Sequence, residues 1–130
     1  MTIQTEISFG EFLDKLTILE IKAERIGDPA KLENINRELS LLREIWSRHP
    51  ASATDVSVPL ARLKAVNEQL WHIEDAIRDK ERNREFDQRF IELARAVYVT
   101  NDERAAIKRE LNEMLGSGLV EEKSYANYTS

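Results

Sequence analysis

The sequence predicts an all-α fold, an antiparallel helical hairpin joined by further helices into a small helical bundle. Apolar residues recur at spacings of three and four along most of the chain, and this spacing lines one face of a helix. The 130 residues include only four glycines and three prolines, and 33% of them are charged, which is typical of helix-rich proteins. No segment alternates apolar and polar residues for long enough to predict a sheet.

The first two helices carry their start and stop signals in the sequence. Ser8 and Glu11 fit a capping box, in which each side chain accepts a hydrogen bond from a free backbone N–H at the helix start. Gly27 favours the left-handed conformation that ends many helices. Asp28 followed by Pro29 is typical of the start of the next helix. Because the link is short and the two apolar stripes have similar lengths, we expect an antiparallel hairpin.

Three further helices are predicted after this hairpin. The small and polar residues of segment 50–59 predict a loop. Thr100 and Glu103 form a second capping box, which predicts the start of a fifth helix. We expect residues 1–130 to form a single helical domain, with residues 117–130 as a partly flexible C-terminal tail. The predicted helices span residues 9–26, 29–49, 58–82, 85–99 and 101–115.

The first helix is apolar on two faces. At 100° per residue, Ile18 and Ile21 lie opposite the main apolar stripe, beside Asp14 and Arg25, whereas Glu20 lies on the stripe itself. A buried carboxylate without a partner is costly, so these polar residues are candidates for buried contacts with groups of opposite charge. The favoured interpretation is a central helix with neighbours on two sides. The alternatives are that one face pairs with a second subunit, or that Glu20 lines a pocket.

A line of four side chains runs along the third helix beside its apolar stripe, Asn67, Trp71, Glu74 and Arg78, spaced by four, three and four residues. A Trp ring flanked by an amide, a carboxylate and a guanidinium can stack on a sugar ring or a base and hydrogen-bond at its rim. These four residues are therefore ligand-binding candidates. The simpler and commoner interpretation is an i,i+4 ion pair between Glu74 and Arg78, with Trp71 packed over a neighbouring helix.

The C-terminal segment VEEKSYANY follows a flexible GSG hinge. Such a segment is usually a frayed terminus. Its tyrosine rings would also suit docking on the bundle. Lys123 and Tyr125 are further ligand-binding candidates, because a docked tail could close over the site.

Several classes of function have no support in the composition. The net charge is −5, and the basic residues of segment 78–109 are interleaved with acids, which does not fit a nucleic-acid-binding surface. No apolar run approaches the ~20 residues of a membrane span. The N-terminus lacks the pattern of a signal peptide, so a cytoplasmic location is expected. The chain has no cysteine, which excludes disulfides and thiolate catalysis.

No catalytic residue, metal site or cofactor is predicted. His49 and His72 are too few and too far apart to indicate a metal site, and no glycine-rich loop precedes a helix to hold phosphate. The acidic segment around Glu74 and Asp75 leaves one enzyme alternative open, a magnesium-dependent nucleotide or sugar-phosphate hydrolase. Octahedral magnesium would need carboxylates that converge from two helices, and no helix presents a closely spaced acidic pair inward.

Three stretches carry a family resemblance: FLDKLTILEIKAERI, VNEQLWHIEDAIR, and LARAVYVTNDERAAIK running on to LGSGLVEEKSY. They resemble a family of small bacterial and phage proteins described as a domain of unknown function. The resemblance implies that the gene lies near genes for sugar transfer and surface polysaccharides, and that such chains are sometimes joined to glycosyltransferase-type domains. It implies no catalytic residues. The sequence motifs that recur in the family include the residues Asp14, Lys15, Glu20, Lys22, Asn67, Trp71, Glu74, Asp75, Asn101, Asp102, Glu122, Lys123 and Tyr125.

The function expected from these observations is that of a small accessory or ligand-binding helical module in glycan or nucleotide-sugar metabolism. We expect a homodimer, with a glycosyltransferase-type partner or a sugar or nucleotide ligand. The magnesium-dependent hydrolase is the first alternative, and a dimeric coiled-coil scaffold is the second. The sequence leaves open whether the protein is an enzyme.

Overall fold

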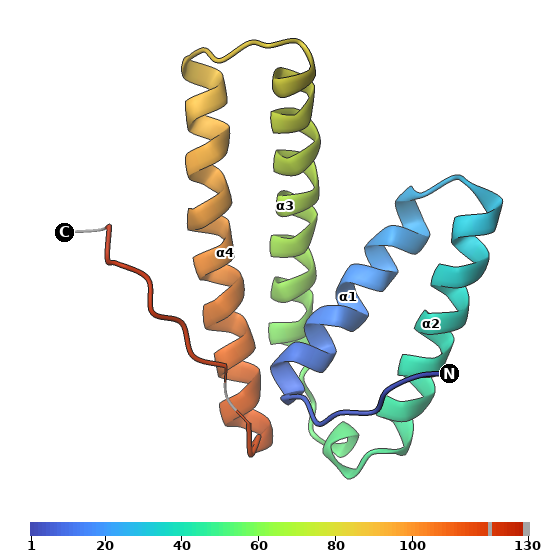
Figure 1. The fold of residues 1–130 in the computed structure, drawn as a ribbon. Coiled ribbons are helices and arrows are strands. Elements are labelled where there is room, and N and C mark those ends of the chain that lie inside the picture. Colours follow the sequence, from blue (N-terminus) through green and yellow to red (C-terminus); the bar gives the residue numbers. More distant parts are fainter. Residues whose placement is uncertain (120, 129–130) are drawn as a thin grey trace.

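The computed structural model describes residues 1–119 and 121–128. This part of the chain forms four α-helices and one short 3-10 helix, without a strand, so the all-α prediction is confirmed (Figure 1). The elements are α1 (Phe9–Arg25), α2 (Pro29–Arg48), η1 (Pro50–Ala53), α3 (Ser57–Arg82) and α4 (Gln88–Leu115).

Two helical hairpins make up the fold. Helices α1 and α2 run antiparallel, as expected, and α3 and α4 form a second, longer hairpin beside them (Figure 1). Helix α1 packs against each of the other three α-helices. The interpretation of the first helix as a central element with neighbours on two sides is therefore correct.

Local signals account for how the first two helices start. The Ser8 hydroxyl accepts a hydrogen bond from the Glu11 backbone N–H at 3.1 Å, which is half of the predicted capping box. The Glu11 carboxylate turns to Lys108 of α4, 2.7 Å away. At the start of α2, the Asp28 carboxylate accepts a hydrogen bond from the Ala30 backbone N–H at 3.2 Å.

The end of α1 differs from the prediction. Ile26 follows the last helical residue with an extended backbone, φ −83° and ψ 128°. Gly27 therefore does not provide a left-handed stop, and the left-handed glycine is Gly116, with φ 67°, after α4. The turn can form this way because Asp28 and Pro29 restart a helix at once, without needing a left-handed residue before them.

The apolar core lies where α1 meets its neighbours. Ile21 is 2% exposed within the single chain, so later helices of the same chain cover the second apolar face of α1. Ile18 is half-buried on that face. The main buried cluster consists of Leu13, Leu16, Leu19, Leu39, Leu42, Val56, Leu63, Val66, Ile107 and Leu111.

The predicted boundary between a fourth and a fifth helix is wrong. Helix α4 runs without interruption through Thr100 and Glu103, and Thr100 is 6% exposed. The residue that caps α4 is Asp87, whose carboxylate accepts a hydrogen bond from the Phe90 N–H at 3.0 Å. A cap contributes only about 1 kcal/mol, and continuous packing of α4 along α3 outweighs the local signal at Thr100.

The turn between α3 and α4 is held by its own charged residues. Asn83 caps α3, and Arg84 follows in the left-handed region with φ 54°. Lys80 Nζ lies 3.0 Å from Glu85 and 2.9 Å from Asp87, across the turn. The charged segment after Ile77 is therefore the exposed end of α3 and the turn that follows it.

Candidate functional site

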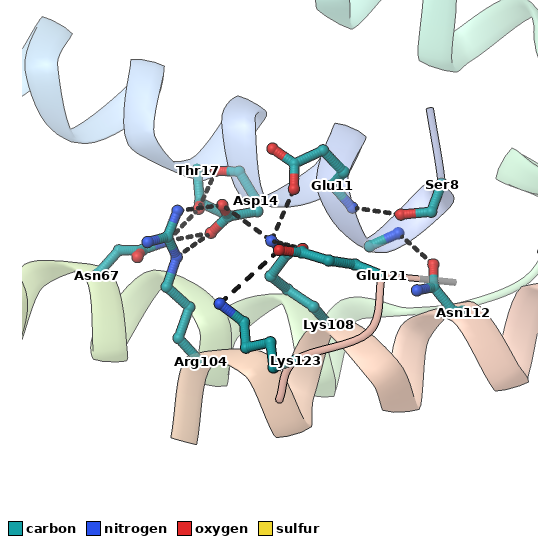
Figure 2. A network of polar contacts seen from close by, with 11 residues as sticks. Ser8, Glu11, Asp14, Thr17, Asn67, Arg104, Lys108, Asn112, Glu121 and Lys123 are labelled. Atoms are coloured by element: carbon teal, nitrogen blue, oxygen red, sulfur yellow. Dashed lines mark hydrogen bonds and ion pairs between the residues drawn. The ribbon is translucent and has the colours of Figure 1, made fainter. Parts of the chain in front are cut away.

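A buried carboxylate lies at the junction of α1, α3 and α4. Asp14 is 1% exposed, and the Arg104 guanidinium donates to both of its oxygens, with Nε 2.9 Å from Oδ1 (Figure 2). The Asn67 amide donates to the same Oδ1 at 2.9 Å. This bidentate geometry is the strongest form of ion pair available to a carboxylate, and it ties three helices together.

The Asn67 side chain is fully engaged on its donor side. Its amide nitrogen also donates to the Thr17 hydroxyl at 2.9 Å, while that hydroxyl donates to the Asp14 backbone carbonyl at 2.8 Å. Both amide hydrogens are therefore used in hydrogen bonds within the protein, to Asp14 and to Thr17. Only the carbonyl oxygen of Asn67 remains for the ligand contact that the sequence predicts.

Lys108 continues the polar network toward the start of α1. Its side chain is 11% exposed, and its ammonium lies 2.7 Å from Glu11, 3.0 Å from Glu121 and 4.0 Å from Asp14. Burial acts to lower the pKa of Lys108, but the hydrogen bonds that its ammonium donates to Glu11 and Glu121, together with the nearby carboxylate charges, outweigh it and the pKa is raised. The hydrogen bonds that Arg104 donates to Asp14 raise the pKa of Arg104. Both residues are therefore cationic at neutral pH.

Helices α1 and α4 approach each other closely at Gly10. The Gly10 N–H donates to the Asn112 side-chain oxygen at 2.7 Å. A Cβ at this position would lie 2.4 Å from the Lys108 backbone oxygen, which is closer than atoms can approach. A residue without a side chain is therefore needed where the two backbones meet.

A hollow of about 380 Å³ opens beside this network, and we call it the Trp71 hollow. Apolar side chains from α1 and α3 form one part of its wall, and amide, carboxylate and guanidinium groups form the rest. Its lining residues are Ile18, Ile21, Asn67, Leu70, Trp71, Glu74, Asp75, Asn101 and Arg104. The structure thus brings Asn67, Trp71 and Glu74 into one concave site with residues of α1 and α4.

A second hollow of about 600 Å³, the tyrosine hollow, lies between α4 and the C-terminal tail. It shares Asn101 and Arg104 with the Trp71 hollow, so the two are adjacent across the same part of α4. Its lining residues are Tyr98, Asn101, Asp102, Arg104, Lys123, Tyr125 and Tyr128. Lys123 and Tyr125 therefore line the tyrosine hollow and not the Trp71 hollow.

The tail reaches this position through polar contacts with α4. Arg109 pairs with Glu122 at 3.0 Å, and the Tyr128 hydroxyl donates to Asp102 at 2.6 Å. The Lys123 ammonium lies 5.6 Å from the centre of the Tyr125 ring, within cation–π range. Residues 121–128 have no helix or strand, so these side chains determine where the tail lies.

Arg78 does not join the other ligand-binding candidates. Its side chain is 75% exposed and pairs with Glu74 at 3.3 Å, and it does not line the Trp71 hollow. The helix explains this, because four residues beyond Glu74 the chain has risen about 6 Å past the hollow. The simpler interpretation of an i,i+4 pair holds for Arg78, while Trp71 faces the hollow.

Two of the three buried-polar candidates are less buried than expected. Glu20 is half-buried and lies 3.6 Å from Lys64 and 3.9 Å from Arg43, so the expected cationic partners are present. Arg25 is exposed, because it lies in the last turn of α1, where it pairs with Glu68 at 3.8 Å. Its classification as buried is wrong. Asp14 is the fully buried member of the three.

Three network residues on α4 were not singled out from the sequence. Arg104, Lys108 and Asn112 follow one another at spacings of four, so they lie on one face of α4. Their spacing marks a polar face on α4, but spacing alone does not say which helix that face meets. Asp14 lies on another helix, 90 residues before Arg104, and only the fold shows that they meet.

Within residues 1–119 and 121–128, no group of three or more His, Cys, Asp or Glu side chains converges in a way that could hold a metal ion. Glu74 and Asp75, which suggested the magnesium-dependent hydrolase alternative, therefore do not belong to such a group, and Glu74 pairs with Arg78.

The family of the chain follows from a comparison of its full length. A family model described as "Family of unknown function (DUF6165)" matches residues 3–130. The chain belongs to this family. The match includes all four α-helices and the tail. It confirms the resemblance to a family of unknown function that the three sequence stretches indicate. No curated protein and no solved structure gives a significant match. Among the described residues, no helix has the length and apolar character needed to cross a membrane.

Proposed function

We propose that this DUF6165 chain is a small ligand-binding accessory module, and that its Trp71 hollow holds the sugar or base ring of a glycan or nucleotide-sugar ligand. The observation that carries the proposal is the composition of this hollow. Trp71 and two isoleucines of α1 line one part, and Glu74, Asp75 and Arg104 line the rest. A volume of about 380 Å³ lies within the range of ~300–1,000 Å³ typical of small-molecule sites.

The chemistry of the wall favours a ring that carries hydroxyl groups. An aromatic face binds the apolar face of a sugar or the π-face of a base. Carboxylates such as Glu74 and Asp75 accept hydrogen bonds from hydroxyls at the ring's rim. The setting in sugar transfer that the family resemblance implies supports the same class of ligand.

The proposal also includes a cytoplasmic homodimer that works beside a glycosyltransferase-type partner. Exposed apolar side chains on α4, including Ile91, Tyr98 and Val99, supply surface that a second copy would bury. The molar mass in solution tests this part by itself. A monomer at all concentrations would remove the dimer and leave the ligand proposal in place.

The ligand proposal is tested with tryptophan fluorescence. The chain has two tryptophans, and Trp46 lies elsewhere, against Phe12 at 6.1 Å between ring centres. The Trp46→Phe variant therefore leaves Trp71 as the single reporter. We expect a nucleotide sugar such as UDP-glucose to change its emission saturably, and an equal concentration of glucose 6-phosphate or uridine to show which part of the ligand is bound.

Matched variants separate binding from packing. In the native background, Trp71→Ala should weaken ligand binding about 5–150-fold, since stacking on one aromatic is worth about 1–3 kcal/mol. Glu74→Gln should weaken binding less, and Glu44→Gln on the surface of α2 should leave it unchanged. If Trp71→Ala unfolds the protein and no sugar or nucleotide raises the melting temperature of the native chain, Trp71 is a packing residue and the proposal is wrong.

A further inference from the structure

We propose that a third hollow, between the start of α1, helix α4 and the tail, binds the phosphate groups of the ligand, and that Glu121 holds this place in the unliganded chain. The hollow measures about 250 Å³, and the residues that define its chemistry are Ser8, Lys108, Arg109, Asn112, Glu121 and Lys123. We call it the cation hollow. This inference extends the proposed function: the anion site is new, and the ring site that binds the rest of the ligand is the one proposed above.

The charges of the cation hollow favour an anion. Its lining includes three cationic side chains, Lys108, Arg109 and Lys123, and one carboxylate, Glu121, although the chain as a whole has a net charge of −5. Lys108 lines this hollow and is nearly buried, and Figure 2 shows its ammonium held among the carboxylates of Glu11, Asp14 and Glu121. Desolvated cations bind phosphate more strongly than exposed ones, because water competes less with the anion.

The tail carboxylates are the groups that an anionic ligand would replace. Glu121 lies 3.0 Å from Lys108 and 3.7 Å from Lys123, and Glu122 lies 3.0 Å from Arg109. Each cation of the hollow is thus neutralised by a carboxylate from a segment that has no helix or strand. The side chains of Arg109 and Glu122 are 49% and 73% exposed, and exposed pairs of this kind are weak and easily exchanged.

Release of Glu121 would not leave Lys108 unpaired. The Glu11 carboxylate of α1 lies 2.7 Å from the Lys108 ammonium, and Asp14 lies 4.0 Å from it. These two partners belong to α1 and stay in place when a phosphate group takes over the contacts of Glu121 with Lys108 and Lys123, which keeps Lys123 in the hollow. Glu121 is therefore an additional partner, which explains how the fold can tolerate its replacement by a phosphate group.

The cation hollow is connected to the proposed ring site through the tyrosine hollow. Lys123 lines both the cation hollow and the tyrosine hollow, which in turn shares Asn101 and Arg104 with the Trp71 hollow. Asn101 and Lys108 are seven residues apart on α4, about 10 Å along the helix axis. This separation suits a ring joined to a diphosphate, so the ligand class is a sugar or nucleoside that carries phosphate groups.

The test measures binding of inorganic pyrophosphate, which has no ring, to the full chain by isothermal titration calorimetry at low salt. The double variant Glu121→Gln with Glu122→Gln removes the internal competitors, and we expect the dissociation constant to fall about two- to tenfold. The double variant Arg109→Gln with Lys123→Gln should raise it about tenfold or more. Lys108 is left unchanged because it also joins α1 to α4.

Controls with the same change in net charge exclude a general electrostatic effect. Glu33→Gln with Glu44→Gln, both on α2, should not tighten pyrophosphate binding as the tail variant does. Arg37→Gln with Arg48→Gln should not weaken it as the cation-hollow variant does. If each pair of variants changes the dissociation constant equally, or if native chain and variants all fail to bind pyrophosphate, the proposed anion site is wrong.

The same experiment distinguishes this inference from the ring site. Trp71→Ala should leave pyrophosphate binding unchanged while it weakens binding of UDP-glucose. If Trp71→Ala leaves UDP-glucose binding unchanged while the native chain still binds pyrophosphate, the proposed sugar or base ligand is overturned and the anion site is kept. A ligand that depends on Trp71 but not on Arg109 and Lys123 would keep the ring site and overturn the anion site.

Discussion

The Asn67 amide nitrogen lies 2.9 Å from Asp14 Oδ1, and this contact joins α3 to α1 across 53 residues of sequence. The sequence predicts different roles for the two residues: Asn67 is a ligand-binding candidate and Asp14 is a buried-polar candidate. Their contact means that the floor of the Trp71 hollow and the buried ion pair of Asp14 with Arg104 are parts of one structure. A change in the ion pair is therefore expected to reach the candidate site.

The first prediction concerns this ion pair. Asp14→Ala should lower the free energy of unfolding by about 3–5 kcal/mol, because it leaves the half-buried Arg104 and the Asn67 amide without their partner. Urea denaturation measures the loss. Asp79→Ala removes a carboxylate from an exposed pair with Arg82, whose side chains are 63% and 75% exposed, and should cost less than about 1 kcal/mol. Equal losses in the two variants would show that the buried network contributes little.

The second prediction concerns the contact between α1 and α4. Gly10→Ala should cost about 1–3 kcal/mol, since the new methyl group would overlap the Lys108 backbone oxygen and the two helices must move apart. Gly27→Ala is the matched control, because no atom lies within 4 Å of its added Cβ and its φ is not positive. That variant should be neutral or stabilising by up to about 1 kcal/mol. A Gly10→Ala protein as stable as the native one would contradict the close approach.

The third prediction concerns the tail and pH. The hydrogen bond from Lys108 lowers the pKa of Glu121 below its ordinary value of 4.5. The docked tail therefore favours the charged carboxylate, so docking is fully supported above pH 4.5 and is lost as the pH falls through the lowered pKa. Besides Lys108, the charged groups near Glu121 are Lys123 in the tail, Arg104 on α4, and Glu11 and Asp14 on α1.

Backbone ¹⁵N relaxation of Tyr125 measures this release. We expect its order parameter to fall as the pH drops below about 4.5, while circular dichroism shows that the helices remain. Glu121→Gln removes the titrating group, and the tail of this variant should be mobile at neutral pH and should change little on acidification. If the native tail is equally mobile at pH 7 and pH 3, the contacts of Glu121 do not hold it in solution.

Much of the helical architecture could be predicted because helix ends depend on nearby residues. The Ser8 cap and the Asp28 cap involve atoms within three residues of each other, so a short sequence motif is enough to predict each cap. The apolar spacing of α1 and α2 likewise fixed which faces would be buried. The local signal was wrong at Thr100, where a capping-box motif lies inside α4. Packing of α4 against α3 contributes more to stability than a helix cap at Thr100 would.

The candidate site was predictable only in part. The line of Asn67, Trp71 and Glu74 follows from helical spacing alone, and these three residues do share the Trp71 hollow. Arg78 obeys the same spacing but lies beyond the hollow, since spacing places residues on a face and does not say where along it a cavity ends. Arg104 has no local signal of a role with Asp14, because 90 residues separate the two.

The sequence by itself determined that this protein is helical, that its first two helices form an antiparallel hairpin, and where those helices begin. Spacing and capping act over a few residues, and they require no knowledge of a partner helix. Only the tertiary structure decided which partners Asp14 has, that α4 continues through Thr100, and that three hollows lie beside α4. These features depend on the register between helices, which is fixed by packing over whole interfaces and by close contacts such as that of Gly10 with α4.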